Sequence, residues 1–158
     1  MAIDMKAFMK QDLKDRGTME FTGIDKFKDK DGKPIPFIIK RLSRKEVNDI
    51  RHMYRTRKVY RDKNNGDRPV ITNNGQVAII QDYDAERAGL QMMVDAFVQP
   101  KLDDPDLMAY YGVLDRLDMP QVIFSDLDDF NYADDCLMIA LGLKNPEKDD
   151  AVINEVKN

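Results

Sequence analysis

The stretch FKDKDGKPIPF, residues 27–37, limits the start of this chain to one of two local structures. An EF-hand calcium loop needs oxygen ligands at its first, third and fifth positions, glycine at the sixth and a carboxylate at the twelfth. With Gly32 at the sixth position, Phe27 falls at the first and Ile38 at the twelfth, and neither side chain can bind calcium. Asp31-Gly32 is instead a preferred pair for a two-residue hairpin turn, in which both residues need positive φ. The stretch therefore predicts a β-hairpin.

Turn and capping signals divide the rest of the chain into short strands followed by helices. Ser43 and Glu46 have the spacing of a capping box, which starts a helix, and Asn74-Gly75 between two β-branched runs predicts a second hairpin. The order of elements predicts an α+β fold, in which N-terminal β-hairpins pack against a predominantly helical C-terminal half. The predicted elements are a short helix capped by Asp4, strands 19–28 and 34–42, a helix over 44–61, the hairpin at 74–75, a helix over 85–99 capped by Asp82 or Asp84, and helices from Asp104-Pro105 to Gly112, from Pro120 to Phe124 and over 129–141.

The composition is that of a soluble globular protein with a heavily charged surface. Hydrophobic residues make up 42% of the chain and charged residues 34%. No apolar run approaches the roughly 20 residues that span a bilayer, and the start MAIDMKAFMK does not have the pattern of a secretory signal. A single cysteine, Cys136, excludes an internal disulfide and fits a reducing cytoplasm. Since Cys136 and His52 are the only cysteine and histidine, neither is expected to bind a metal.

Charge is unevenly distributed along the chain, which has a net charge of −4. Basic residues dominate 40–63 and acidic residues dominate 82–135. Such asymmetry indicates a nucleic-acid surface or complementary faces for protein contacts, but a solvated basic helix near an acidic one also explains it. A nucleic-acid-binding accessory role through the basic helix 44–61 therefore stays open, although no stacking platform or DNA-binding motif accompanies the charge. The candidate basic face consists of Arg44, Lys45, Arg51, Arg55 and Lys58.

Catalytic and cofactor motifs are not found in the sequence. The patterns GxxxxGK[ST] and GxGxxG are missing, so no phosphate cradle is expected. His52 is the only imidazole, and it lies in the basic helix without an identifiable nucleophile. Adjacent aspartates such as Asp134-Asp135 point about 100° apart on a helix, and aspartates at helix starts are explained by capping and the helix dipole. We therefore expect no enzyme activity, no cofactor and no metal site.

The segment PKLDDPDLMAYYGVLD, residues 100–115, contains the pattern P-x-L-x-D-x-x-L-x-x-x-Y-G-V. This pattern resembles the XkdN-like phage tail assembly chaperones. Upstream, FMKQDL and FKDKDGKPIPFIIKRLSRKEVNDIR are similar to the family's amphipathic start, strand, turn, strand and charged helix, and the resemblance covers most of residues 7–143. We expect a single domain over 1–143 and a charged, flexible tail over 144–158. The hairpin around 64–80 is longer than the family pattern.

The resemblance implies a non-catalytic role in building the tails of long-tailed phages. Such proteins bind the tape measure protein, a very long and largely helical chain, and help tail tube protein to polymerise around it. The resemblance places this work in the host cytoplasm and not in the mature virion. A long amphipathic chain without its tube exposes apolar surface and would aggregate. The ten methionines suit an adaptable apolar surface, although each one is more simply explained as core.

Apolar residues nearly encircle the helix predicted over 85–99. A helix with this pattern is either wholly buried or shared with a partner, and we predict that part of the helical half is an interface for self-association or for the tape measure protein. Met92→Asp is then expected to weaken binding without unfolding the domain, whereas unfolding would place Met92 in the core. The basic face would steer the encounter more than it adds affinity. The candidate partner-binding residues are Met92, Met93, Phe97, Met108, Tyr111 and Met119.

Overall fold

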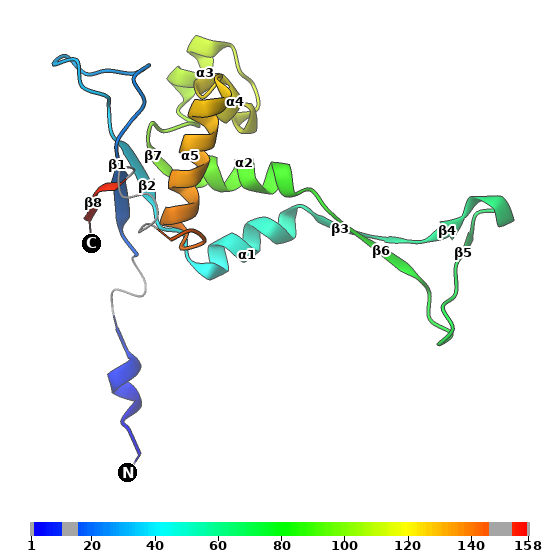
Figure 1. Cartoon of the computed structure of the whole chain (residues 1–158). Helices are drawn as coiled ribbons and strands as arrows, with labels where there is room; N and C mark the ends of the chain where they lie inside the picture. The colour runs from blue at the N-terminus through cyan, green and yellow to red at the C-terminus, as the bar shows by residue number, and fades with distance from the viewer. Residues whose placement is uncertain (1, 11–15, 146–152, 158) are drawn as a thin grey trace.

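The computed structural model describes residues 2–10, 16–145 and 153–157, and it combines a small β-sheet, a helical half and a long β arm that projects from them (Figure 1). The predicted α+β class is confirmed. The helices are η1 (Met5–Phe8), α1 (Arg44–Met53), η3 (Lys63–Asn65), α2 (Ala85–Ala96), α3 (Pro105–Tyr111), η4 (Arg116–Asp118), α4 (Met119–Ile123) and α5 (Leu127–Ala140), where η marks a 3-10 helix. The strands are β1 (Thr18–Phe21), β2 (Phe37–Lys40), β3 (Arg55–Val59), β4 (Arg61–Asp62), β5 (Arg68–Pro69), β6 (Ile79–Tyr83), β7 (Phe97–Gln99) and β8 (Ile153–Lys157).

The central sheet has the strand order β7-β2-β1-β8, and its neighbouring strands are antiparallel. Successive side chains on a strand point to opposite faces, so one face of β1 and β2 is apolar. Met19 and Phe21 on β1 and Phe37 and Ile39 on β2 are buried on that face. Helix α5 crosses it, as Figure 1 shows, and α2 lies beside α5. The hydrophobic core therefore lies between the sheet and these two helices.

An aromatic cluster joins the sheet to the helical half. The ring centroid of Phe37 lies 5.5 Å from that of Phe97, 5.6 Å from that of Phe124 and 5.9 Å from that of Tyr132. Tilted and edge-on contacts at these distances are the arrangements that aromatic rings prefer. The Tyr132 hydroxyl also donates a hydrogen bond to the backbone carbonyl of Thr22. The N-terminal hairpin thus packs against the helical half, as predicted.

The strands of the N-terminal hairpin are shorter than the predicted 19–28 and 34–42. Regular pairing covers β1 and β2, and an isolated bridge between Lys28 and Pro34 adds a second point of pairing further along the hairpin. Pro34 and Pro36 have no backbone N–H to donate. This explains why the regular ladder with β1 begins only at Phe37, the first residue of β2.

The hairpin turn itself differs from the predicted two-residue turn. The Asp29 carboxylate accepts hydrogen bonds from the backbone N–H groups of Asp31, at 2.8 Å, and Lys33, at 3.0 Å. Gly32 has a φ of +78°, while Asp31 is not among the residues with positive φ. The prediction that both residues take positive φ was wrong, because the Asp29 side chain holds a longer turn that requires positive φ only at the glycine.

Helix α1 begins at the predicted capping box. The Glu46 N–H donates to the Ser43 hydroxyl oxygen at 3.2 Å, and the Ser43 N–H donates to a Glu46 carboxylate oxygen at 3.3 Å. Val47 and Ile50 are buried, as their helical spacing predicted. The helix ends at Met53, so the prediction of one continuous helix over 44–61 was wrong.

The second part of that predicted helix is strand β3. It pairs with β6 in antiparallel register, from Arg55 opposite Tyr83 to Val59 opposite Ile79. Strand formation depends on a partner strand more than on intrinsic propensity, and here the paired residues lie at least 20 positions further along the chain. The helical spacing of apolar residues in 44–61 carried no information about that partner.

The paired strands form the root of the β arm, which we define as residues 55–83. At the outer end of this root, three backbone hydrogen bonds form a junction. The Tyr60 N–H donates to the Ala78 carbonyl at 2.9 Å, the Ala78 N–H to the Val70 carbonyl at 2.8 Å, and the Val70 N–H to the Tyr60 carbonyl at 2.9 Å. Two short branches leave this junction (Figure 1). One is the β4–β5 hairpin, and the other contains the predicted Asn74-Gly75 turn.

The Asn74-Gly75 turn is present, with a φ of +78° at Gly75 and a bridge between Ile71 and Val77. The isoleucines that follow it pair with β3 instead of extending this hairpin. The predicted turn was therefore confirmed, while its outgoing strand found a different partner.

Helix α2 begins where it was predicted and ends earlier than predicted. Asp84 caps it by accepting a hydrogen bond from the Arg87 N–H at 3.1 Å. The helix ends at Ala96, so the predicted extent of 85–99 was wrong for its last three residues. These residues form β7, which pairs with β2 at the edge of the sheet. The following Gln99-Pro100 peptide bond is cis.

The later helices follow the predicted signals closely. Asp104 accepts a hydrogen bond from the Leu107 N–H at 3.0 Å to start α3, and Gly112, with a φ of +68°, ends it. Helix α5 begins two residues before the predicted 129 and is followed by Gly142 in the left-handed conformation.

The predicted tail over 144–158 contains a strand that its sequence had not indicated. Strand β8 pairs with β1 and completes the central sheet. The rest of that prediction falls partly on residues 146–152 and 158, which lie outside the described residues.

Candidate partner-binding surfaces

Most of the predicted partner-binding residues lie in the hydrophobic core. The apolar pattern around α2 thus reflects apolar side chains that the fold buries, while Glu86, Arg87 and Asp95 on the same helix are exposed. Met108 is half-buried against the core, and Tyr111 is exposed. Four of the six predicted partner-binding residues are at most 4% exposed: Met92, Met93, Phe97 and Met119.

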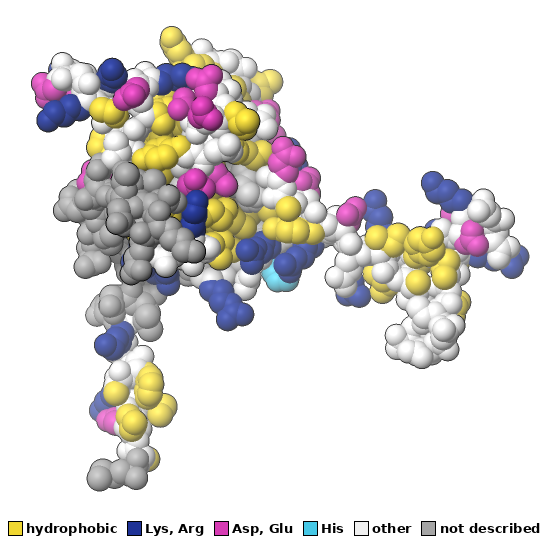
Figure 2. Space-filling view, in the orientation of Figure 1, with side chains coloured by type: hydrophobic (Ala, Val, Ile, Leu, Met, Phe, Trp, Pro, Cys, Tyr) yellow, Lys and Arg dark blue, Asp and Glu magenta, His cyan; other side chains and the backbone are white. Residues whose placement is uncertain are grey.

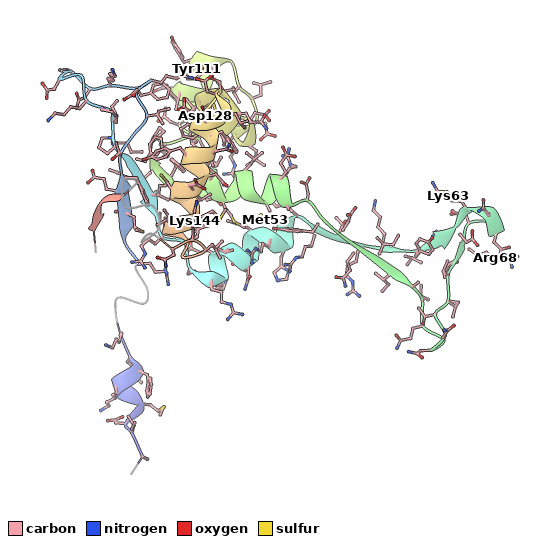
Figure 3. All side chains as sticks on the ribbon, viewed as in Figure 1. Met53, Lys63, Arg68, Tyr111, Asp128 and Lys144 are labelled. Carbon is pink, nitrogen blue, oxygen red and sulfur yellow. The ribbon has the colours of Figure 1, made fainter. Side chains whose placement is uncertain are left out.

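Helix α3 carries the predicted Tyr111 into a group of exposed apolar side chains that we call the α3 surface, made of Tyr110, Tyr111 and Leu114. Tyr110 is 81% exposed and Leu114 is 99% exposed. The two tyrosine rings contact each other edge to face, with centroids 4.9 Å apart. Figure 3 shows Tyr111 at the end of the molecule that α3 forms. Sequence reasoning missed Tyr110 and Leu114, although both lie within the segment 100–115 that it singled out.

The β arm exposes apolar side chains with no core beneath them. Every residue of β3 and β6 is exposed, and an isolated two-stranded ladder is marginally stable in water. Figure 2 shows apolar side chains gathered near the junction, with Lys and Arg side chains on both sides. We call them the arm apolar cluster: Val59, Tyr60, Ile71, Val77, Ile79 and Ile80, each between 43% and 57% exposed.

The predicted basic face is divided between two elements, with Arg44, Lys45 and Arg51 on α1 and Arg55 and Lys58 on β3. The Lys45 ammonium lies 2.8 Å from the Asp49 carboxylate, and this hydrogen bond raises the pKa of Lys45. The Arg55 guanidinium lies 5.3 Å from the centroid of the Tyr83 ring, a cation–π contact. Further cations, Lys63 and Arg68, lie at the outer end of the arm (Figure 3).

A hydrogen-bond network fixes the root of the arm to the helical half. The Tyr54 hydroxyl donates to the Gln91 side-chain oxygen at 2.9 Å, and the Gln91 amide nitrogen donates to the Asp95 carboxylate at 2.9 Å. Arg116 binds the other Asp95 oxygen at 3.0 Å. Gln91 is only 4% exposed, so these bonds satisfy a buried polar group that would otherwise destabilise the fold.

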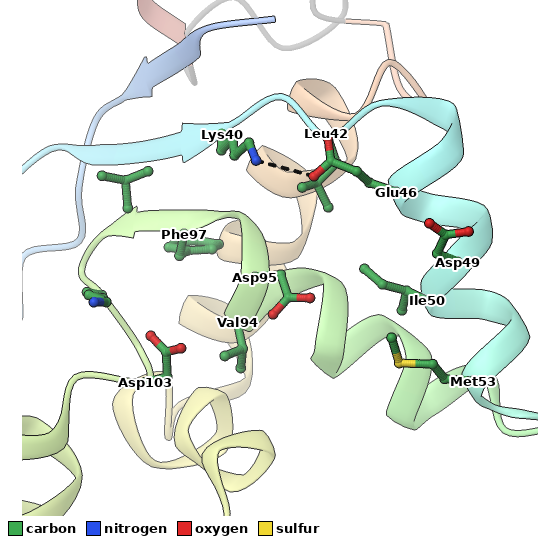
Figure 4. Close-up of a pocket in the computed structure, with 12 residues that line it drawn as sticks. Lys40, Leu42, Glu46, Asp49, Ile50, Met53, Val94, Asp95, Phe97 and Asp103 are labelled. Atoms are coloured by element: carbon green, nitrogen blue, oxygen red, sulfur yellow. Dashed lines mark hydrogen bonds and ion pairs between the residues drawn. The ribbon is translucent and has the colours of Figure 1, made fainter. Parts of the chain in front are cut away.

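A groove lies between α1 on one side and α2 with β7 on the other (Figure 4). Ile50, Val94 and Phe97 give it an apolar lining. Two of its charged groups have structural roles, because Glu46 belongs to the capping box and pairs with Lys40 at 3.2 Å. The arrangement stabilises the packing of α1 and does not assemble a nucleophile with a base.

A second groove, the α2–α5 groove, lies between α2, α4 and α5. Its lining is apolar, from Leu90, Met93, Phe124, Phe130 and Met138. Leu127, at 72% exposure, stands at its edge with the acidic Glu86 and Asp134. Burial raises the pKa of Asp134, and the neighbouring Asp135 raises it further. This groove combines apolar and acidic groups.

The structure gives no support for metal or thiol chemistry in the part of the chain that it describes. Within residues 2–10, 16–145 and 153–157, no three His, Cys, Asp or Glu side chains lie close enough together to hold a metal ion. Burial raises the pKa of the Cys136 thiol to about 12, so it stays protonated near neutral pH. None of the described helices is long and apolar enough to span a membrane.

The structure is that of an α+β protein whose distinctive surface features are the exposed α3 surface, the β arm and two grooves. The sequence model of the phage XkdN-like tail assembly chaperone family matches residues 5–126. The chain therefore belongs to this family, which confirms the resemblance seen in residues 100–115. No curated protein sequence matches the chain significantly.

A solved structure, the crystal structure of the protein yqbn, is similar in fold. Its TM-score is 0.65 at 15% sequence identity, and the match covers 91% of this chain and 100% of that chain. At this identity the likeness concerns the fold alone.

Proposed function

We propose that this protein is a phage tail assembly chaperone that binds the tape measure protein and assists polymerisation of the tail tube around it, without catalysing a reaction. The observation that carries this proposal is membership of the tail assembly chaperone family over residues 5–126. The protein would act in the host cytoplasm and leave before the virion is complete.

The physical task suits a protein with small exposed apolar surfaces. A long amphipathic chain that waits for its tube exposes apolar side chains and tends to aggregate. A chaperone has to cover them with modest affinity, so that tube subunits can displace it. The α3 surface fits this task, since tyrosine contributes large contact area at interfaces and Leu114 is almost fully exposed.

The proposal is tested by coexpression with the tape measure gene of the same phage. We expect the tape measure protein to move into the soluble fraction and to co-purify with this protein. Leu114→Asp is expected to reduce the recovered complex, while Leu143→Asp, the same change at another exposed leucine, should not. Unchanged solubility together with no co-purification would reject the proposed function.

Nucleic-acid binding is the alternative that the basic residues of α1 and β3 favour. Binding to a phosphate backbone weakens steeply as salt rises, so a gel shift at low salt that disappears with added salt would support it. Under the chaperone proposal these cations act on the encounter rate with an acidic partner, and we expect no shift.

A further inference from the structure

Residues 3–9, which we call the N-terminal segment, lie apart from the body, that is, the central sheet and the helical half (Figure 1). Asp4 caps η1 by accepting a hydrogen bond from the Lys6 N–H at 3.0 Å, but no residue of η1 is buried. Helices this short are not stable in water by themselves, so the segment needs a surface to pack against. Its apolar side chains are Ile3, Met5, Phe8 and Met9, each between 64% and 75% exposed.

The N-terminal segment is tethered beside one groove of its own molecule. The Gly17 carbonyl accepts a hydrogen bond from the Arg41 N–H at 3.1 Å, and the neighbours of Arg41, Lys40 and Leu42, line the groove of Figure 4, which we call the α1–β7 groove. Residues 10–16 separate the segment from Gly17 and can span up to about 25 Å at about 3.6 Å each. Strand β7 lies two strands away from β1, which is about 10 Å at the usual strand spacing. The segment can therefore reach the groove without a second molecule.

The α1–β7 groove has room for apolar side chains at the end nearest the tether. Its volume of about 660 Å³ lies within the range of about 300–1,000 Å³ that is typical of binding clefts. Leu42 and Phe97 give this end a buried apolar floor, and Val98 beside them is half exposed. Met53 lies at the opposite end from Lys40 (Figure 4). An apolar segment that enters from the tether therefore meets Val98 and leaves Met53 exposed.

The charges of the segment and the groove are complementary. Within the described part of the chain, Lys6 and Lys10 form no ion pair, and neither does Asp103 at the groove. Exposed ion pairs contribute little to affinity, so these groups orient the segment more than they hold it. The charged residues of the lining are Glu46, Asp49, Asp95 and Asp103, against Lys40 and Lys101.

We propose that the N-terminal segment docks into the α1–β7 groove of its own molecule as a strap across the edge of the central sheet. Its apolar side chains then cover Val98 and the floor beside Leu42, and Lys6 approaches Asp103. Removing both apolar surfaces from water drives the docking, and Figure 1 shows the strap released. A partner that binds this groove has to displace the strap, so the segment controls access to the groove. The inference does not rest on the proposed function, because both surfaces belong to this chain.

The test uses tryptophan fluorescence, because the chain contains no tryptophan of its own. Phe8→Trp places the probe on the segment, and Leu114→Trp places a reference probe at an almost fully exposed position. We expect the Phe8→Trp chain to emit at shorter wavelength and to be quenched less by acrylamide than the Leu114→Trp chain, because docking shields the indole from water. Since the strap docks within one molecule, this difference should be the same at every protein concentration.

Second substitutions in the Phe8→Trp chain locate the docking surface. Val98→Asp in the groove should abolish the difference, whereas Leu127→Asp, at an exposed leucine outside the groove, should leave it unchanged. Met5→Asp on the segment should also abolish it, and this change lies outside the body, so it leaves the folding of the body intact.

A cysteine pair tests the contact directly. With Phe8→Cys and Val98→Cys in one chain, mild oxidation should give a disulfide within the monomer, seen on a non-reducing gel. Phe8→Cys combined with Leu127→Cys is the matched control and should not form this disulfide. The buried Cys136, whose thiol pKa is raised to about 12, stays protonated and does not compete. If circular dichroism shows that Val98→Asp unfolds the chain, the cysteine pair decides.

Three results would overturn the proposal. The first is a Phe8→Trp chain that emits and is quenched as the Leu114→Trp chain is. The second is a difference that grows with protein concentration, which would assign the segment to a second copy. The third is a difference that a folded Val98→Asp chain retains, which would assign it to another surface. Tape measure solubility enters none of these measurements, so the proposed function is tested separately.

Discussion

Met92 and Met53 form a matched pair for testing where the core ends. Met92 lies in α2 with 4% of its surface exposed, whereas Met53, the last residue of α1, is 64% exposed. Truncating a buried methionine to alanine removes its burial energy and leaves a cavity, which together cost about 2–5 kcal/mol. We therefore expect Met92→Ala to lower the free energy of unfolding by about 2–5 kcal/mol, and Met53→Ala to change it by less than about 0.5 kcal/mol.

Urea and thermal unfolding followed by far-UV circular dichroism measure both variants. For a chain of this size 1 kcal/mol shifts the midpoint temperature by about 2–4 °C, so Met92→Ala should melt roughly 4–20 °C below the unmodified protein. Equal effects of the two substitutions would refute the argument from burial.

Met92→Asp extends the same test. It places a carboxyl group in the core, where an unpaired charge is strongly destabilising, and we expect the cooperative transition to be lost. A Met92→Asp protein that keeps its thermal transition and loses only partner binding would show instead that this side of α2 is a surface.

Three further predictions concern other parts of the fold. Gly23→Ala should lower the free energy of unfolding by about 1–3 kcal/mol or more, because a Cβ at Gly23 would clash with the backbone carbonyl oxygen of Ile35 across the hairpin. Gly89→Ala, in open space within α2, should instead raise it by about 0.5–1 kcal/mol. Chemical denaturation measures both changes. Tyr54→Phe leaves the side-chain oxygen of the buried Gln91 without its hydrogen-bond donor and should lower the free energy of unfolding by about 1–3 kcal/mol in the same assay. An unchanged free energy of unfolding would indicate that water replaces the hydroxyl. Cys136, whose thiol pKa is raised to about 12 by burial, should react with a thiol reagent at pH 8 only after denaturant is added, and rapid labelling of the native protein would contradict its buried position.

Sequence reasoning succeeded where structure is determined by neighbours in the chain. The capping box at Ser43 and Glu46 and the pair Asp104 and Gly112 mark helix ends through hydrogen bonds within three or four residues, and such bonds can be read directly from spacing.

Strands that depend on distant partners were missed. β3, β7 and β8 pair with segments at least 20 residues away in sequence, and β-propensity alone does not specify such partners. The same limit applied to the candidate site. The methionines of α2 were predicted to form an interface because the sequence gives the apolar pattern but not the layers of sheet and helix that cover it, whereas Tyr111, in the segment 100–115, lies at an exposed position.

The junction of the β arm is made from backbone groups of Tyr60, Val70 and Ala78. Hydrogen bonds of this kind place no demand on the side chains beyond them, and exposed turn tips tolerate insertions and substitutions. The two outer branches can therefore change in length and sequence from one phage to another while the junction, the arm root and the body keep their structure. The tips of this arm can thus diverge without any compensating change in the core.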